Sequence, residues 1–374
     1  MMKNVNMVSI DLGTKNLIVK VNDQIVYDQP SIIVFDNESG QVFIGEEALI
    51  MRDKTPINKL VREPLANGVI SDVNALIALL TEIFVNIVQV NNRKIWKRGN
   101  FWKNSVVLVA VPSKIYRLDE DVLRQALHGK QPARISSFSE KFKRYEYFNK
   151  VMNAEKIVIM PAVKLATIGA GVSIWDSQGA FLLDVGAGTS DCSIVATGDI
   201  IIQDSINIAG NTIDAAIQKY LEEMHYVSVT REQAENIKIE VGINIEGRDD
   251  LRDIDKQITI YGKSLKTGTP TKIILQKEEI QKIILEAIEP IVDLCKSIIL
   301  RSSASFAKVI QENGLILTGG TSLLKNIDVY LSQRLNLEKV IIANEPKHSV
   351  IKGTEIYEMY KNDLYDKEFI RPSR

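Results

Sequence analysis

The chain contains the same short pattern twice. One apolar run ends in Asp11-Leu12-Gly13-Thr14, and a second ends in Asp184-Val185-Gly186-Ala187-Gly188-Thr189. Each pattern is followed by an alternating, strand-like stretch, a tight-turn pair (Asn22-Asp23 and Gly198-Asp199) and another β-rich run. A repeat with matching flanks indicates two similar lobes, each containing a β-hairpin led by an Asp-x-Gly turn.

The residue types in the repeat suit phosphate and metal binding. Glycine lets the backbone amides of a turn approach a phosphate closely. An aspartate at each strand end, Asp11 and Asp184, offers the oxygen ligands that hydrated Mg²⁺ prefers. A single Asp-x-Gly turn is a common structural element, but its repetition favours a phosphate clamp built from two halves.

Composition limits the class of protein. The 374 residues exceed what one hydrophobic core usually organises, so we expect two domains. A net charge of -1 gives no basis for nucleic-acid binding. Cys192 and Cys295 have no metal-ligand spacing and are expected to be buried, inert thiols in a reducing cytoplasm. Three widely separated histidines make a histidine metal site or a catalytic triad improbable.

No secretory or membrane-spanning segment is expected. The start of the chain lacks the apolar core of a signal peptide and runs directly into the first strand. The most apolar helical pattern, residues 74–90, is interrupted by Thr81, Glu82 and Asn86 and therefore predicts a packed core helix. We expect a cytoplasmic protein.

Strand and helix patterns alternate along the chain, which indicates an α/β sheet with crossovers. The expected strands, besides the two hairpins, are 32–35, 105–111, 156–160 and 315–317. The expected helices are 74–90, 119–127, one opening at 209–214, 230–239 and 277–303. Two turn-rich stretches, 36–72 and 246–271, are expected to be inserted subdomains, and the first is poor in helical periodicity.

A third glycine turn, Thr318-Gly319-Gly320-Thr321, completes an ordered set. This order resembles the actin, sugar-kinase and heat-shock-chaperone superfamily. Further stretches narrow the resemblance to bacterial actins of the MreB family, and the resemblance extends over nearly the whole chain. These stretches are 58–72, 109–113, 168–171, 234–242 and 316–320.

The resemblance implies an actin-like ATPase fold. In this α/β architecture each of two lobes has a five-stranded mixed sheet flanked by helices, and each lobe carries a small inserted subdomain. The implied bounds are 1–32, 70–178 and 347–374 for the core of lobe I (IA), 33–69 for IB, 179–210 and 272–346 for the core of lobe II (IIA), and 211–271 for IIB.

The resemblance also implies a nucleotide, ATP or ADP, with Mg²⁺ held mostly through water by Asp11 and Asp184. Glu235 and Lys238, spaced i and i+3 on a helix, would face the adenosine; a solvated helix pair is the alternative. The implied nucleotide-binding residues are Gly13, Thr14, Lys15, Asn16, Gly186, Ala187, Gly188, Thr189, Gly210, Asp214, Glu235, Lys238, Gly319, Gly320 and Thr321.

One departure from the family affects catalysis. Where the family has Glu-Glu-Pro-Met, this chain has Pro161-Ala162-Val163-Lys164, so neither Pro161 nor Ala162 can accept a proton from water. General-base assistance contributes about 10²–10⁴ in rate. We therefore expect at most a weak ATPase, with Thr189, Ser190 and Asp191 as the remaining weak candidates for positioning water. Lys164 either holds phosphate or is a surface lysine.

A basic and aromatic loop indicates membrane contact. Trp and Phe side chains flanked by cations suit the boundary of an anionic bilayer. A local aromatic cluster with solvated charges is the alternative. The candidate membrane residues are Trp96, Lys97, Arg98, Phe101 and Trp102. The segment 128–150, longer than the family norm, is either a partner surface or a local elaboration.

Together these features predict a cytoskeletal protein that binds ATP, stacks head to tail into paired actin-like filaments and controls cell shape or motility. The expected partners are the protein itself, the inner face of the cytoplasmic membrane, to which it would be peripheral, and other bacterial actins, with no nucleic acid. A small-molecule phosphotransferase on the same fold is the main alternative. A chaperone-like ATPase is less favoured, because no peptide-binding domain follows the nucleotide core.

Overall fold

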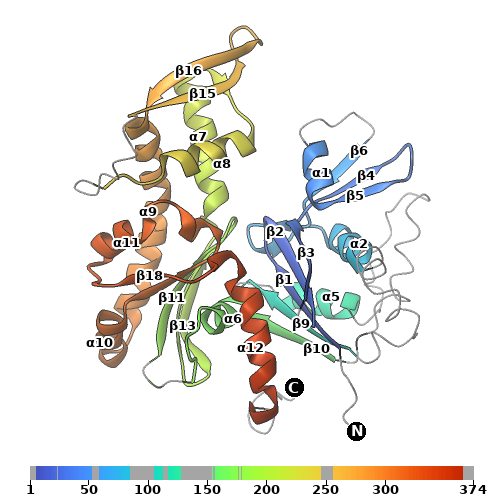
Figure 1. Ribbon diagram of the computed structural model, residues 1–374, viewed down its shortest axis with the longest axis vertical. Helices are drawn as coiled ribbons and strands as arrows, with labels where there is room; N and C mark the ends of the chain where they lie inside the picture. Colours follow the sequence, from blue (N-terminus) through green and yellow to red (C-terminus); the bar gives the residue numbers. More distant parts are fainter. Residues whose placement is uncertain are drawn as a thin grey trace. The chain divides into compact units, whose positions relative to one another are not determined.

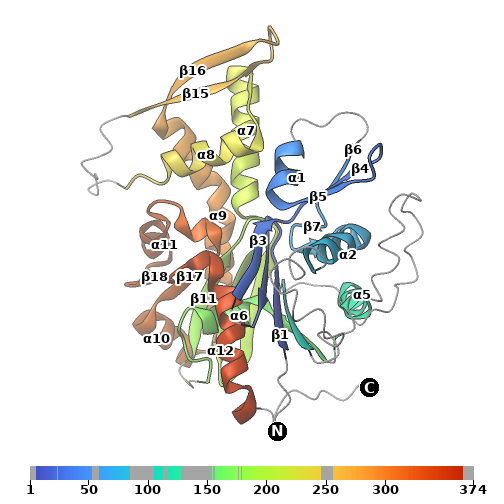
Figure 2. The same ribbon diagram turned by 45° about the vertical axis from the view of Figure 1, so that its right-hand side comes forward.

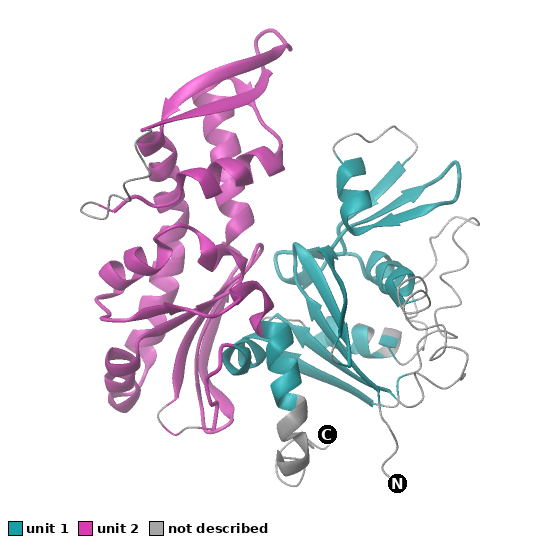
Figure 3. Ribbon diagram, in the orientation of Figure 1, with its two compact units in different colours: residues 1–169, 350–374 teal, residues 170–349 magenta. Residues whose placement is uncertain are grey.

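In a computed structural model, the chain divides into two units. Unit 1 comprises residues 1–169 and 350–374, and unit 2 comprises residues 170–349 (Figure 3). The structure describes residues 6–22, 24–52, 59–84, 105–112, 117–127, 154, 156–175, 177, 179–245 and 256–364. The chain therefore crosses from unit 1 to unit 2 near 169 and returns near 350, whereas the expected boundaries of the lobe cores are 178 and 347.

Unit 1 is built on a five-stranded mixed sheet with the order β10-β9-β1-β2-β3 (Figure 1). The strands β10, β9 and β1 are parallel, and β1, β2 and β3 form an antiparallel meander. The bounds are β1 (Asn6–Leu12), β2 (Asn16–Val21), β3 (Gln24–Pro30), β9 (Ser105–Val111) and β10 (Lys156–Pro161).

Unit 2 repeats this topology. Its sheet has the order β18-β17-β11-β12-β13, with β18, β17 and β11 parallel and β11, β12 and β13 antiparallel. Each meander also has a β-bulge at the same place: the strand register shifts once between β2 and β3 in unit 1 and once between β12 and β13 in unit 2. The bounds are β11 (Ala180–Val185), β12 (Ser190–Ala196), β13 (Asp199–Ile206), β17 (Leu315–Thr318) and β18 (Val340–Ile342). The predicted duplication and the two five-stranded mixed sheets are confirmed.

Helices cover the sheet of unit 1. The helices α2 (Val73–Glu82) and α5 (Arg117–Leu127) share one apolar core with the strands. The opposite face carries α6 (Ala162–Gly169) and α12 (Ser349–Leu364), as Figures 1 and 2 show. The buried ammonium of Lys20 lies 2.8 Å from a carboxylate oxygen of Glu355 and ties α12 to β2.

A small subdomain follows β3 in unit 1. It contains a three-stranded sheet of the order β5-β4-β6 and the helix α1. The bounds are β4 (Ile33–Asp36), β5 (Val42–Ile44), α1 (Gly45–Arg52), β6 (Lys59–Arg62), β7 (Leu65–Ala66) and β8 (Val69–Ile70). The sequence of this stretch is poor in helical periodicity, yet it contains α1. Only Gly45 and Ala48 of α1 are buried, so its sequence lacks the apolar stripe that marks a helix.

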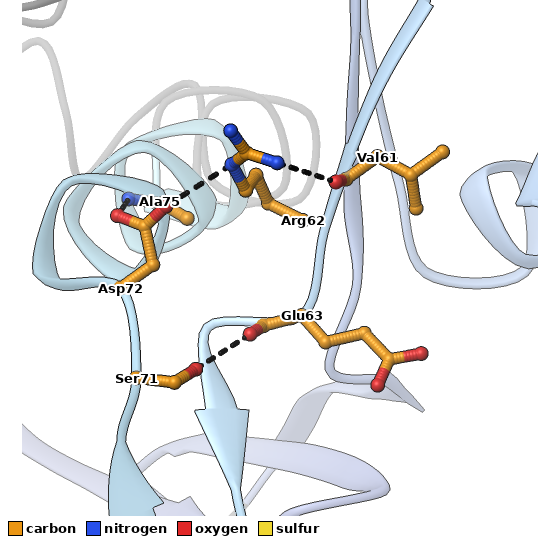
Figure 4. Close-up of polar contacts among 6 residues, drawn as sticks. All are labelled: Val61, Arg62, Glu63, Ser71, Asp72 and Ala75. Atoms are coloured by element: carbon orange, nitrogen blue, oxygen red, sulfur yellow. Dashed lines mark hydrogen bonds and ion pairs between the residues drawn. The ribbon is translucent and has the colours of Figure 1, made fainter.

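Polar contacts fasten this subdomain to the start of α2 (Figure 4). The Asp72 carboxylate accepts a hydrogen bond from the Ala75 amide at 3.0 Å, which caps the helix. Its other oxygen lies 3.3 Å from the Arg62 guanidinium at the end of β6. The Ser71 hydroxyl donates to the Glu63 carbonyl at 2.8 Å. These contacts hold the β7–β8 turn in place between β6 and α2.

Unit 2 combines its sheet with a helical layer. The bounds of the helices are α7 (Gly210–His225), α8 (Arg231–Val241), α9 (Lys277–Arg301), α10 (Ala304–Asn313), η4 (Gly320–Leu323), α11 (Ile327–Leu335) and η5 (Pro346–His348). The predicted capping box is confirmed: Thr230 accepts from the Gln233 amide at 3.2 Å and donates its own amide to the Gln233 side chain at 2.8 Å. The predicted helix 277–303 ends at Arg301, and α10 follows.

A second small sheet, of the order β14-β15-β16, lies beside α7 and α8 in unit 2. Its strands are β14 (Val227–Ser228), β15 (Gln257–Ser264) and β16 (Pro270–Gln276). The stretch 246–271 was expected to be turn-rich, but it contains β15. Ile258 and Ile260 are buried while Thr259 and Tyr261 are exposed, which is strand alternation within a charged sequence.

The hairpin turn after β12 differs from the expected pair Gly198-Asp199. Ala196 pairs with Asp199, so the two-residue turn is Thr197-Gly198. Both residues have positive φ, 52° and 86°. This is the twist that two-residue hairpins prefer, and it places glycine at the second turn position.

Several sequence predictions concern residues outside those that the structure describes. They are the membrane-loop residues Trp96, Lys97, Arg98, Phe101 and Trp102 and the segment 128–150. Among the helices that the structure describes, none has the length and apolar character needed to cross a bilayer. Cys192 and Cys295 are fully buried, as expected, with their sulfur atoms 3.8 Å apart.

Candidate functional site

The predicted phosphate turn of unit 1, residues 13–15, joins β1 to β2. A Cβ atom at Gly13 would collide with the backbone carbonyl of Asn16, so only glycine fits there. The Thr14 hydroxyl accepts a hydrogen bond from the Gly68 amide at 3.2 Å. Lys15 and Asn16 are exposed, and the Lys15 carbonyl accepts from the Ser31 amide at 2.7 Å. The turn is therefore held on both sides while its polar groups remain accessible.

Gly68 is a supporting residue that the sequence interpretation missed. It belongs to a tight turn, Asn67-Gly68, in which both residues have positive φ, 49° and 73°. The Asn-Gly pair is a recognisable turn signal in the sequence. Its contact with Thr14, 54 residues away, becomes visible only in the folded unit.

The predicted phosphate turn of unit 2, residues 186–189, is fixed through its carbonyl groups. The Gly186 carbonyl accepts from the Gly210 amide at 3.2 Å and from the Thr321 hydroxyl at 2.7 Å. The Ala187 carbonyl accepts from the Asn211 amide at 2.8 Å. These hydrogen bonds to its carbonyl groups connect the turn to the start of α7 and to η4.

Asp184, at the end of β11, faces a second acid. It pairs in register with Asp191 on β12 and with Thr318 on β17, whose hydroxyl donates to it at 2.9 Å. Burial, together with the Asp191 charge, raises the pKa of Asp184 to about 6. Directly opposed residues on antiparallel strands lie on one face, so two carboxylates share a partly desolvated site. Oxygen ligands of this kind fit Mg²⁺, which would relieve their repulsion.

The third glycine turn approaches the same place. Gly319 has a φ of 83°, and a Cβ there would collide with the backbone of Val185 and crowd Asp184. Glycine is therefore required by both conformation and space. Thr321, two residues on, is the residue that donates to Gly186. Within unit 2, the predicted second and third turns do come together.

Lys238 and Asp214 form a buried ion pair. The Lys238 ammonium lies 2.7 Å from a carboxylate oxygen of Asp214 and donates to the Gly210 carbonyl at 3.3 Å. Lys238 is 6% exposed and Asp214 3% exposed, so the alternative of a solvated helix pair is wrong for Lys238. Glu235, one turn earlier on α8, is half-buried. Gly210 thereby connects α8 to the phosphate turn of unit 2.

The candidates for positioning water have different surroundings. Asp191 is 6% exposed and lies beside Asp184. The buried Ser190 hydroxyl donates to the Ile208 carbonyl at 2.6 Å, so its proton already has an acceptor. Thr189 is half-buried, and its carbonyl accepts from the Gly186 amide at 3.0 Å. The geometry favours Asp191 and Thr189 over Ser190.

Pro161 and Ala162 lie at a junction in unit 1. Pro161 is the last residue of β10 and Ala162 the first of α6. Lys164, in the first turn of α6, is only 5% exposed. The alternative that it is a surface lysine is therefore wrong.

The family model described as MreB/Mbl protein matches residues 5–143 and 140–365. The chain belongs to the MreB/Mbl family. It is similar to the cell shape-determining protein Mbl of Bacillus cereus, with 30% identity over 93% of this chain and 94% of that protein.

Two solved structures are similar to this MreB/Mbl-family chain. A crystal structure of MreB 5 of Spiroplasma citri bound to AMPPNP superposes with a TM-score of 0.81, at 30% identity over 97% of this chain and 99% of that one. A MamK double helical filament superposes with a TM-score of 0.68 at 17% identity, over 95% and 99% of the two chains. The fold is therefore actin-like, as the duplicated sheet topology indicates.

Proposed function

We propose that this protein is a cytoskeletal protein that binds ATP or ADP with Mg²⁺ and assembles into actin-like filaments influencing cell shape or motility. The observation that carries the proposal is the duplicated sheet, with an Asp-x-Gly turn at the end of the same strand in each copy. The relatives named above support it: one is called cell shape-determining, and another was solved with AMPPNP.

The candidate nucleotide contacts are the following. Backbone amides at Gly13 and Thr14 and at Ala187, Gly188 and Thr189 would bind phosphate oxygens, while the Gly186 amide closes the second turn on the Thr189 carbonyl. Gly210 and Thr321 donate hydrogen bonds to the second turn, Gly319 and Gly320 would let the backbone approach the nucleotide closely, and Glu235 is the candidate contact for the nucleoside. Asp11 and Asp184 would hold Mg²⁺ mostly through water, with Asp191 nearby. The bound metal would supply positive charge against the phosphates.

Hydrolysis is proposed to be slow. Pro161 and Ala162 offer no carboxylate at the end of β10. Asp191 and Thr189 remain to orient a water molecule from unit 2, but Asp191 already lies beside the acidic Asp184. Nucleotide occupancy, rather than rapid turnover, would then favour the conformation that adds to a filament.

Assembly is proposed to be head to tail, because a heterologous contact that does not close into a ring extends indefinitely. The basic and aromatic loop from Trp96 to Trp102 would place these filaments on the inner face of the cytoplasmic membrane. Other bacterial actins sharing this fold are candidate co-assembly partners.

Electron microscopy of the full chain with ATP, ADP or no nucleotide tests the proposal. Double filaments that depend on nucleotide are expected. Monodisperse protein that transfers phosphate to a small hydroxylated substrate would instead support a phosphotransferase on the same fold.

A further inference from the structure

Lys164 is a buried cation in a helix with almost no exposed surface. Residues 163–168 of α6 are all buried, and Lys164 is 5% exposed. Lysine is rarely buried, because removing an ammonium group from water is costly unless anionic or hydrogen-bonding groups surround it. Its position in the first helical turn adds to this cost, since the helix dipole disfavours positive charge there.

The strand register places Lys164 at the phosphate-turn edge of unit 1. The strands β1, β9 and β10 are parallel, so their carboxyl ends lie at one edge of the sheet. Asp11 pairs with Ala110, and Ala110 pairs with Met160. The helix α6 begins directly after β10 (Figure 1), and the turn containing Gly13 and Thr14 begins directly after β1. With strands about 4.8 Å apart, Asp11 and Met160 are separated by about 10 Å.

The charges at this edge are few. Within β1, β9, β10 and α6, which the structure describes in full, Asp11 is the one acidic residue. Lys164 is the one cation at the carboxyl end of these strands, because Lys156 is exposed at the opposite end of β10. Among these four described elements, a single carboxylate and a single buried ammonium therefore lie near the edge from which the turn of unit 1 extends, and Lys15 in that turn is exposed.

We propose that Lys164 is a fixed counter-cation for the phosphate end of the nucleotide, so that triphosphate binding persists when Mg²⁺ is removed. This inference rests on the proposed nucleotide binding described above. A lysine ammonium is a compact point charge that neutralises phosphate. Placed at the edge that carries Asp11, it supplies part of the positive charge that a divalent cation would otherwise provide.

The test is to measure ATP affinity by calorimetry on the full chain, once with Mg²⁺ and once with EDTA. The variants are Lys164→Met and Lys164→Arg, with Lys20→Met as the matched control. Lys20 is a lysine of the same unit, 6% exposed, whose partner Glu355 is half exposed. Methionine resembles lysine in volume but carries no charge, so it removes the ammonium group without opening a large cavity. Thermal unfolding of each variant verifies that it is folded.

In EDTA we expect Lys164→Met to bind ATP about 10- to 100-fold more weakly than the parent, which is the usual contribution of a hydrogen bond to a charged group. With Mg²⁺ the loss should be several-fold smaller. Lys164→Arg should recover most of the affinity, and Lys20→Met should leave the effect of Mg²⁺ unchanged.

Three outcomes would overturn the inference. Equal affinity of parent and Lys164→Met in EDTA would show that the ammonium does not act on phosphate. An equal loss with Mg²⁺ and with EDTA, together with a lower unfolding temperature, would show a purely structural role. Failure of the parent itself to bind ATP under both conditions would instead reject the proposed function, and the inference with it.

Discussion

The ammonium of Lys238 lies 2.7 Å from the Asp214 carboxylate and 3.3 Å from the Gly210 carbonyl. The amide of Gly210 donates to Gly186 in the phosphate turn. The pair therefore joins α8, which carries Glu235, to the start of α7 and to the turn of unit 2. The lysine expected from the sequence to face the adenosine also has a structural partner within its own unit.

Breaking this pair should destabilise the protein. Lys238→Met removes the ammonium partner of the buried Asp214 carboxylate, and Asp214→Asn removes the carboxylate partner of the buried Lys238 ammonium. Each change is expected to lower the free energy of unfolding by about 3–5 kcal/mol. Denaturant unfolding measures this, and the double variant should lose less than the sum of the single losses. Additive losses would show that the two groups do not interact. Glu235→Gln, on the same helix but half-buried, serves as the control and should cost little.

Because the pKa of Asp184 is raised in the folded state, the metal-free protein should become less stable as the pH rises. The pKa of Asp184 is about 6 in the folded state, and the ordinary value of 3.8 represents the unfolded state. Between these values the folded state binds more protons, so the free energy of unfolding falls as pH rises from about 4 to about 6 and is then flat. The shift corresponds to roughly 3 kcal/mol.

Thermal unfolding in EDTA at several pH values tests this prediction. Asp184→Asn should be more stable than the parent above pH 6, and adding Mg²⁺ should stabilise only the parent. Asp36 provides a control of opposite sign, because hydrogen bonds from the Ser39 and Glu38 amides lower its pKa. A parent whose stability does not change between pH 4 and 6 would contradict the assignment.

The sequence predicted strands well where burial is complete. The expected strand 105–111 coincides with β9, whose seven residues are all buried. The helix α1 was missed because it buries only Gly45 and Ala48, which leaves little periodicity to detect. The strand β15 was missed because charged and turn-forming residues obscured its alternation. Patterns that follow burial are therefore predictable, and those at the surface of small subdomains are not.

Within the candidate site, the glycine turns were predictable but their supports were not. Gly13 and Gly319 are required by local geometry, which the sequence pattern reports directly. The contact between Gly68 and Thr14 and the burial of Lys164 and Lys238 depend on tertiary packing. Lysine is usually exposed, so its burial cannot be inferred from residue type.

The contact of Thr14 with Gly68 should contribute to both stability and binding. Thr14→Val removes the acceptor and leaves the Gly68 amide unpaired, with an expected loss of about 1–3 kcal/mol in unfolding free energy. ATP affinity should fall as the turn loosens. Thr14→Ser keeps the hydroxyl and should match the parent in both assays. If valine is as well tolerated as serine, the hydrogen bond does not position the turn.

Membrane contact should depend on Trp96 and Trp102. Replacing both with alanine removes much of the apolar area that the loop can insert, and binding to anionic vesicles should fall roughly tenfold or more. Co-sedimentation with liposomes is the measurement. Trp175→Ala is the matched control, since Trp175 is 38% exposed and packs over Gly198 in unit 2. Equal losses in the double variant and in the control would reject a specific role for the loop.

The hydrolysis rate should respond to a carboxylate restored at the end of β10. Ala162 is the first residue of α6, so Ala162→Glu places an acid at the junction where the family has one. A general base contributes about 10²–10⁴ in rate, and single-turnover hydrolysis of ATP should accelerate toward that range. The neighbouring variant Pro161→Ala adds no carboxylate and should leave the rate low. Nucleotide affinity, measured in parallel, should change little in either variant, since neither position supplies a phosphate contact in the proposed site. A parent that already hydrolyses ATP rapidly would show that Asp191 or another group serves as the base.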